Sequence, residues 1–99
     1  MITEVVEIVL KDGTLELFLA GAEKSRPLFE GSPGFIAFEV HRLIERPSTV
    51  MLLIQWESVA HHMEMFRNSQ QYTAWRENVG EYFAETPRLH HTETVLSYG

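Results

Sequence analysis

The sequence of 99 residues contains no cysteine. This absence excludes disulfide bonds, zinc–thiolate sites, iron–sulfur clusters and a thiol nucleophile, and it fits a reducing compartment. The chain also lacks an apolar run long enough to cross a membrane. No basic segment of a signal peptide is present, and Glu4 and Glu7 interrupt the apolar residues near the start. We therefore expect a cytoplasmic protein that does not enter a membrane.

Basic residues are few, with 8 Lys and Arg against 14 Asp and Glu, and they form no cluster. Nucleic acids and anionic membranes bind a concentrated basic face, so neither is an expected partner. The sequence has no glycine-rich phosphate loop, no nucleophile elbow and no catalytic-triad spacing. Its length suits a single domain over residues 1–99 with one modest core.

The hydrophobic pattern predicts four strands and two helical regions, the second of which is in two pieces. Residues 2–10 indicate a strand, and residues from 15 to about 29 indicate a helix that Pro27 bends or ends. Residues 35–45 and 50–56 form a predicted antiparallel hairpin. Residues 57–68 and 69–86 are helical in spacing, and residues 88–98 close as a strand. The order βαββαβ predicts an α+β fold of the ferredoxin-like type, with helices on one face of an antiparallel four-stranded sheet.

The strand predicted over residues 50–56 is apolar on both faces. Such a strand is normally covered on both sides, and a solvated face built from these residues would expose a large apolar patch. We therefore expect a homodimer in which the free face of the sheet packs against a second copy.

Two adjacent histidines follow Trp56 on the second helical stretch. With a period of 3.6 residues, His62 shares the inner face with Val59, Met63 and Phe66, whereas His61 points to the edge or to solvent. His62 is then either a core histidine bonded to the backbone or a general base, because an imidazole titrates near neutrality.

The last predicted strand carries a second pair of adjacent histidines, and one of the two side chains faces the helices. His90 and His91 alternate across the strand, and His41 on the hairpin is ambiguous. A metal site needs two or three converging ligands, and neighbouring histidines diverge. No metal site is expected.

Five aromatic residues either pack in the core or line a binding site. Most of them are explained by the core, but four lie on the inner face of one helical region and could wall a slot for a flat ligand. These residues are Trp56, Phe66, Tyr72, Trp75 and Phe83.

Several motifs resemble the antibiotic biosynthesis monooxygenase family across nearly the whole chain. They are "PGFIAFEVHR", "LLIQWES", the histidine at 62, "FRNSQQYTAWRENVGEYF" and the ending of "PRLHH" at His91. The resemblance implies a dimeric α+β barrel with a pocket between sheet and helices in each protomer. Some members oxygenate polycyclic phenols or quinols without flavin, haem or metal, and others degrade haem, oxygenate quinols or act like isomerases.

The haem-degrading branch fits less well at two positions. Trp75 stands where that branch places its axial histidine, and a tryptophan cannot bind iron. An asparagine expected in the first strand is replaced by the region of Thr3, Glu4 and Val5. No cofactor is therefore expected.

The resemblance implies a cofactor-independent monooxygenase whose partners are a flat, hydroxylated aromatic substrate and molecular oxygen. Oxygen reacts poorly with neutral closed-shell molecules, so the protein would form and shield a substrate anion. His62 or His91 is the candidate base, Arg42 could stabilise the anion if it points inward, and the aromatic residues form the walls. The alternatives are a non-catalytic dimeric binding or stress protein and an isomerase-type enzyme that uses the same histidines.

Overall fold

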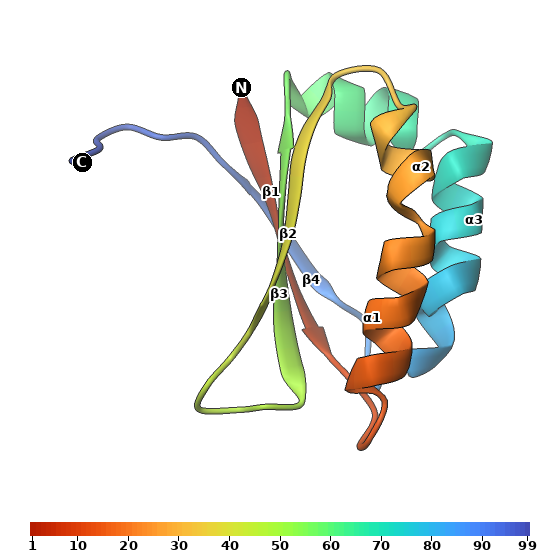
Figure 1. Ribbon diagram of the computed structural model, residues 1–99. Helices are drawn as coiled ribbons and strands as arrows, with labels where there is room; N and C mark the ends of the chain where they lie inside the picture. Colours follow the sequence, from red (N-terminus) through yellow and green to blue (C-terminus); the bar gives the residue numbers. More distant parts are fainter.

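The computed structural model describes residues 1–99 and contains one four-stranded sheet with all helices on one face (Figure 1). The strand order is β2-β3-β1-β4, and each neighbouring pair is antiparallel. This arrangement confirms the predicted ferredoxin-like βαββαβ fold. The elements are β1 (Ile2–Val9), α1 (Leu15–Lys24), α2 (Arg26–Glu30), β2 (Phe35–Arg42), β3 (Thr49–Trp56), the π-helix η1 (His61–Phe66), α3 (Gln70–Val79), the 3₁₀ turn η2 (Gly80–Tyr82) and β4 (Arg88–Thr92).

The core lies between the sheet and the helices. The two central strands, β1 and β3, bury every second side chain along most of their length, as expected for strands with one face on a core. None of the helices has the length and apolar character needed to cross a membrane. The buried hydrophobic residues are Val6, Ile8, Leu10, Phe18, Ala22, Phe29, Val50, Leu52, Ile54, Trp56, Phe66, Trp75 and Val79.

The first helical region is divided into two helices. α1 ends at Lys24, and the Ser25 hydroxyl donates to the carbonyl of Gly21 at 2.8 Å. Pro27 then lies in the first turn of α2, where its missing N–H removes no helical hydrogen bond. Pro27 therefore helps to begin a second helix, where a bend or an end of one long helix was predicted.

A bulge in β2 changes which side chains face the helices. The register shifts between Phe35 and Ala37, so that Phe35 pairs with Trp56 and Phe38 pairs with Ile54. Both partners on β3 face the core, and Phe35 and Phe38 therefore share the helix-facing side. The strict alternation of a regular strand over residues 35–45 predicts that Phe35 and Phe38 lie on opposite faces, and this prediction is wrong because of the bulge.

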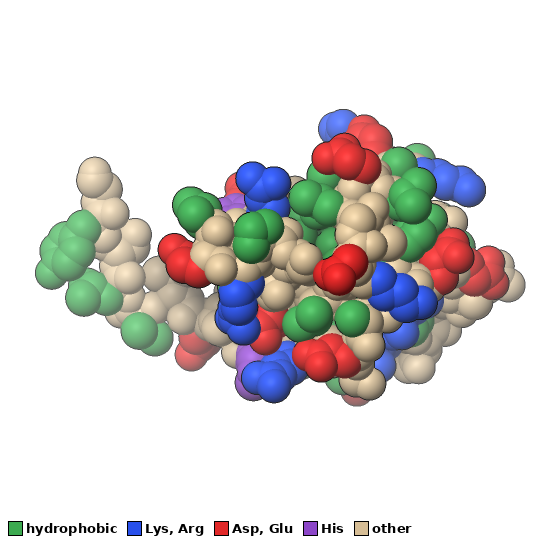
Figure 2. All heavy atoms as spheres, turned by 90° about the horizontal axis from the view of Figure 1, so that it is seen from below, with side chains coloured by type: hydrophobic (Ala, Val, Ile, Leu, Met, Phe, Trp, Pro, Cys, Tyr) green, Lys and Arg blue, Asp and Glu red, His purple; other side chains and the backbone are tan.

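The last strand is shorter than predicted, because β4 ends at Thr92. Residues 93–99, here called the C-terminal arm, run away from the sheet on the side opposite the helices (Figure 1). The hydrophobic side chains of the arm project away from the body of the molecule (Figure 2). Val95, Leu96 and Tyr98 are 88%, 72% and 91% exposed.

Candidate active site

A carboxylate lies inside the core. Glu4 is only 6% exposed, because it occupies the same face of β1 as Val6 and Ile8. The indole N–H of Trp56 donates to its Oε1 atom at 2.9 Å. Burial of a carboxylate is costly unless its oxygens have partners, so this position identifies a built polar site.

The π-helix η1 brings His62 to this carboxylate. In η1 the backbone N–H of Arg67 donates to the carbonyl of His62, five residues earlier, at 2.9 Å. The His62 side chain is 1% exposed and stacks on Trp56 with 5.7 Å between ring centroids. Its Nε2 atom lies 3.3 Å from Oε1 of Glu4. π-Helical turns are frequent at functional sites, where they reorient side chains.

The wider turn changes the inner face that was predicted for this segment. His62 and Phe66, four residues apart, are buried as expected, but Val59 and Met63 are 42% and 38% exposed. A period of 3.6 residues does not describe a helix with bonds between residues five apart.

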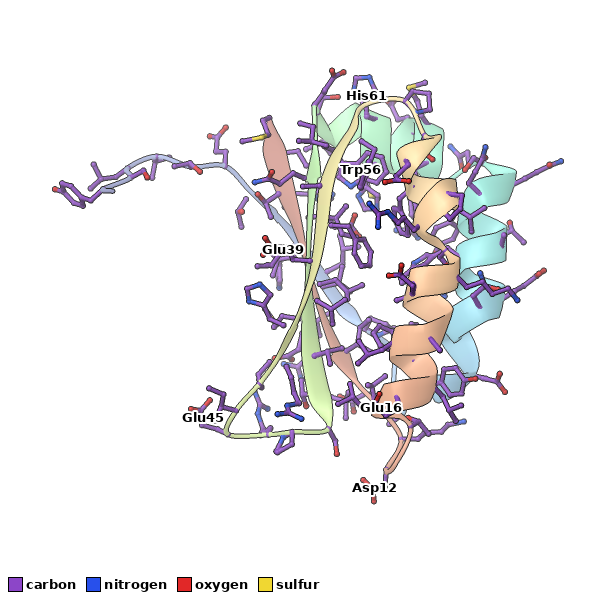
Figure 3. All side chains as sticks on the ribbon, in the orientation of Figure 1. Asp12, Glu16, Glu39, Glu45, Trp56 and His61 are labelled. Carbon is purple, nitrogen blue, oxygen red and sulfur yellow. The ribbon has the colours of Figure 1, made fainter.

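His61 belongs to a different environment. Its Nδ1 atom lies 2.8 Å from the hydroxyl of Ser58, which also accepts the backbone N–H of His61. Figure 3 shows His61 at the end of the molecule and Trp56 between the sheet and the helices. The predicted distinction between the two neighbours is confirmed, since His62 points inward and His61 does not.

His91 completes the network from the edge of the sheet. It lies opposite Glu4 in the pairing of β1 with β4, so both side chains point toward the helices. Its Nε2 atom lies 2.8 Å from Nδ1 of His62. His91 is half-buried and is therefore the member of the network that meets solvent, whereas His90 faces the other way and is exposed.

The surroundings keep both imidazoles neutral. Burial lowers the pKa of His62 to about 4, and the nearby His91 and Arg67 act in the same direction. Burial also lowers the pKa of His91. In contrast, burial raises the pKa of Glu4 to about 7, although the Trp56 hydrogen bond and the charge of Arg67 oppose this change. Glu4 is therefore the group of the network that titrates near neutral pH.

The three side chains form a linear chain. Glu4 contacts Nε2 of His62, while His91 contacts Nδ1 on the other side of the same ring. Their polar atoms therefore do not converge on one point. The structure contains no group of three or more His, Cys, Asp or Glu side chains that could hold a metal ion.

A separate apolar pocket opens along β2. Its volume is about 820 Å³, and nine of its thirteen lining residues are hydrophobic, which suits an apolar ligand. Phe29, Phe35 and Phe38 form its aromatic wall. Four charged side chains, Glu16, Glu23, Arg26 and Glu30, also line it.

The pocket and the histidines occupy opposite edges of the sheet. β2 is one edge strand and β4 the other. The core aromatic rings stand between them, since Phe29 contacts the rings of Trp56 and Phe66 at centroid distances of 6.4 Å and 5.0 Å. Neither His62 nor His91 lines this pocket.

The predicted wall residues lie outside the pocket lining. Trp56, Phe66 and Trp75 are buried in the core, and Tyr72 and Phe83 are half-buried beside it. The structure also separates Arg42 from the histidines, because Arg42 is exposed and pairs with Val50, six residues from Trp56 along β3. Positions 50 and 56 are roughly 20 Å apart in an extended strand, so Arg42 lies far from the end of β3 near His62.

Sequence reasoning missed two groups near the histidines. Glu4 had a detectable signal, because a carboxylate in phase with Val6 and Ile8 in a strand is a polar residue on the core face. Arg67 is half-buried, lies 5.0 Å from the centre of the Tyr72 ring, and its charge acts on Glu4 and His62. No local signal separated it from a surface arginine.

The fold and the site define an α+β protein of the ferredoxin-like class with a buried Glu–His–His network. The chain belongs to the antibiotic biosynthesis monooxygenase family, whose sequence model matches residues 1–78. A candidate antibiotic biosynthesis monooxygenase from Bordetella bronchiseptica is 41% identical, covers 96% of this chain and 97% of its own, and superposes with a TM-score of 0.94. The predicted family is confirmed.

More distant relatives extend the comparison. The uncharacterized protein YczJ of Bacillus subtilis (strain 168) is 25% identical over 95 residues, which cover 96% of this chain and all of YczJ. A candidate antibiotic biosynthesis monooxygenase from Nitrosomonas europaea is 17% identical, covers 97% of this chain and 100% of its own, and has a TM-score of 0.80. At that identity, the second similarity shows the fold alone.

Proposed function

We propose that this protein is a cofactor-independent monooxygenase that oxidises a flat, hydroxylated aromatic or quinol-type molecule with molecular oxygen. Two features support the substrate class. The chain belongs to a monooxygenase family, and the pocket along β2 has an apolar lining with three phenylalanines. In such a reaction the substrate supplies all four electrons. In an anthrone a ring CH₂ becomes C=O, and in a hydroquinone the ring becomes a quinone while one ring C–H becomes C–OH. In both cases the second oxygen atom leaves as water.

The observation that carries the proposal is the buried Glu4–His62–His91 network. Oxygen attacks an electron-rich anion more readily than a neutral ring, so the protein must first remove a proton. Both imidazoles are neutral near pH 7 and His91 reaches the surface, so His91 is the member able to accept a proton from outside. The carboxylate behind them stabilises the cation or takes up the proton itself.

The charges around the pocket restrict the substrate. Three glutamates and one arginine line it, and Arg26 is already paired with Glu30 at 2.9 Å. The net negative charge disfavours an anionic substituent on the bound molecule. We therefore propose a neutral or cationic aromatic as ligand, with its ionisable hydroxyl directed away from the glutamates.

A second candidate function follows from the distance between the pocket and the histidines. Because the core aromatic rings separate them, the pocket can hold a ligand that never meets the network. The protein would then be a binding or stress-related module without catalysis. An isomerase-type reaction, which moves a proton without oxygen, is a third use of the same histidines.

We also propose a homodimer that packs sheet against sheet as a dimeric α+β barrel. Proteins of this family are typically dimeric. In this chain the sheet face away from the helices carries Val5, Val9, Met51 and Leu53, all half-buried in the single protomer. A second copy on this face would remove them from water.

The test compares four variants, His62→Ala, His91→Ala, Ala20→Trp and the control His61→Ala. Oxygen and substrate consumption are measured with an anthrone and a naphthohydroquinone, after subtraction of the rate without protein, and binding is measured by tryptophan fluorescence. We expect His62→Ala and His91→Ala to lower turnover by roughly 10²- to 10⁴-fold, the usual contribution of a general base. His61→Ala should change turnover little.

The outcomes separate the candidate functions. Ala20 lies on the pocket lining and is exposed, so a tryptophan there should fill the pocket and weaken binding without opening the core. Binding that Ala20→Trp abolishes, without turnover in any variant, would support the binding module. Equal substrate conversion with and without oxygen would support the isomerase. Melting temperatures of all variants show whether each remains folded.

A further inference from the structure

We infer that Glu4, His62 and His91 form a proton relay, in which a proton accepted at Nδ1 of His91 on the sheet edge is passed through His62 and stored on Glu4 inside the core. The inference concerns where the proton goes, and it assigns a role to Glu4. Only His91 would touch a proton donor. Glu4 and His62 act through it.

The hydrogen-bonding partners define the relay before proton uptake. The Glu4 carboxylate accepts the indole N–H of Trp56 and faces Nε2 of His62, which therefore carries the proton of this neutral ring. Nδ1 of His62 is then an acceptor, and Nε2–H of His91 donates to it across 2.8 Å. This leaves Nδ1 of His91 with a free lone pair.

Uptake of one proton reverses every donor and acceptor in the chain. The proton binds Nδ1 of His91, the proton of His91 Nε2 moves to Nδ1 of His62, and the proton of His62 Nε2 moves to Glu4. Both rings end neutral in the other tautomer, and the carboxylate becomes a carboxylic acid. The total charge changes from −1 to 0, so one proton enters and none is lost.

Because of the positions of the three groups, a proton from solvent reaches Glu4 through His91 and His62. Glu4 and His62 are 6% and 1% exposed, so solvent reaches the chain through half-buried His91. The contact between Nε2 of His62 and Oε1 of Glu4 is 3.3 Å long and is not aligned as a hydrogen bond, so the His62 ring must turn toward the carboxylate before a proton can pass. Proton transfer can then follow the chain without opening the core.

The burial and the charges around the relay bring the pKa of Glu4 close to neutral pH. The groups that face it are the Trp56 indole on β3, Arg67 after η1, and His91 on β4. Burial raises the pKa of Glu4 to about 7, while the pKa of His62 falls to about 4, so the proton comes to rest on the carboxylate. A base of this strength is matched to neutral pH.

The role of the relay in catalysis rests on the proposed function. In the oxygenation, a substrate that reaches His91 at the β4 edge would give its hydroxyl proton to His91, and the relay would remove this proton to Glu4, away from the developing anion. A ligand that stays in the pocket along β2 would not use the relay, because that pocket lies at the opposite edge of the sheet. The relay itself exists without a substrate, and it can therefore be tested without one.

The test is an NMR titration of the imidazole nitrogens in uniformly ¹⁵N-labelled protein between pH 5.5 and 8.5. We expect both His62 and His91 to carry the proton on Nε2 at high pH and on Nδ1 at low pH, with one shared midpoint and no imidazolium. In Glu4→Gln this exchange of tautomers should be lost, although the glutamine oxygen can still accept the Trp56 N–H.

Arg67→Gln supplies a test that leaves Glu4, His62 and His91 in place. Because the positive charge of Arg67 lowers the pKa of Glu4, its loss should raise the shared midpoint. His90→Asn, on the outer side of β4, is the control and should leave the midpoint unchanged. Rings that keep one tautomer throughout, or that become imidazolium, would overturn the relay.

Activity separates the relay from the proposed function. An observed exchange of tautomers in a protein that does not oxidise the quinols would keep the relay and reject the oxygenase. Turnover without an exchange of tautomers would keep the oxygenase and reject the relay. If both hold, Glu4→Gln should remove the pH dependence of kcat that has the same midpoint as the NMR titration.

Discussion

His61 and His62 are adjacent residues with different physical roles. His61 bonds to Ser58 near the surface, whereas His62 enters the core and meets Glu4 and His91. A buried imidazole is usually satisfied by one backbone carbonyl, but both ring nitrogens of His62 face side chains that themselves titrate. That set of partners distinguishes a proton-carrying histidine from one that only fills space.

The first prediction concerns Glu4 and the pH dependence of stability. The pKa of Glu4 is raised from 4.5 to about 7, so the free energy of unfolding should fall as pH rises between these values. The pKa of His62 is lowered from 6.5 to about 4, so its contribution to stability should rise over pH 4 to 6.5. The two effects oppose each other over most of this range.

Glu4→Gln removes only the first effect. Relative to the wild type, this variant should gain about 3 kcal/mol of stability between pH 4 and pH 8, since one pKa unit corresponds to about 1.4 kcal/mol. Urea unfolding across this range measures the gain, and Glu77→Gln on the exposed face of α3 controls for loss of a carboxylate. A constant difference between Glu4→Gln and wild type would show that folding does not shift the pKa of Glu4.

At the scale of elements, two irregularities decide which side chains of the helices and strands face the core. The π-helix η1 turns His62 and Phe66 inward, and the bulge in β2 turns Phe35 to the pocket side. Both irregularities lie near the same end of the sheet, where Phe35 pairs with Trp56. They build the aromatic layer between the pocket and the histidines.

The second prediction concerns the glycine that precedes β2. Gly34 and Gly13 both have positive φ, at 80° and 74°. A Cβ at Gly34 would lie 2.3 Å from Cγ of His61, whereas one at Gly13 would have no atom within 4 Å. Gly13→Ala should therefore lower stability by about 1–2 kcal/mol, the cost of the left-handed backbone alone.

Gly34→Ala should lower stability by roughly 1–3 kcal/mol more than Gly13→Ala, because the imidazole must move. Chemical denaturation of both variants measures the difference. In the double variant Gly34→Ala/His61→Ala the excess over Gly13→Ala should fall only in part, because the Cβ of residue 61 would still lie 2.7 Å from the new Cβ. Equal costs for the two single variants would show that His61 yields freely and does not fix this turn.

At the scale of the whole molecule, the two faces of the sheet differ. The helices cover one face, and the other face is open in the single protomer (Figure 1). The C-terminal arm also leaves the domain on the open side, with apolar side chains in solvent. Both features suit a molecule whose second layer is another copy.

The third prediction tests this dimer. Leu53 lies on the open face and pairs with Val5 on β1 and Glu39 on β2, so Leu53→Lys would place a charge in the middle of the interface. We expect a dimer for the wild type and monomers or aggregates for the variant in sedimentation velocity at micromolar concentration. Leu17→Lys, on an exposed position of α1, is the matched control and should remain dimeric. A soluble wild-type monomer would contradict the proposed interface.

Much of the fold could be predicted from the sequence because its signals are local. The alternation in β1 and β3, the serines before η1 and α3, and the helical spacing of Trp75 and Val79 each depend on residues a few positions apart. Ser69, for example, accepts the backbone N–H of Tyr72 as a helix cap, as its position predicts. These local preferences are sufficient for the order βαββαβ.

The network and the pocket depended on tertiary structure. Glu4, Trp56, His62 and His91 lie far apart in the sequence and meet only because β1 pairs with both β3 and β4 while η1 packs above them. The pocket lies at the β2 edge, and a register shift places Phe35 on its wall. A strict period of two does not predict this shift. The sequence by itself determined the order of the elements and most of the buried apolar side chains, although Val59 and Met63 are exposed and Glu4 is buried. Strand register and the width of one helical turn decided which buried groups touch, because both are set by packing between distant segments.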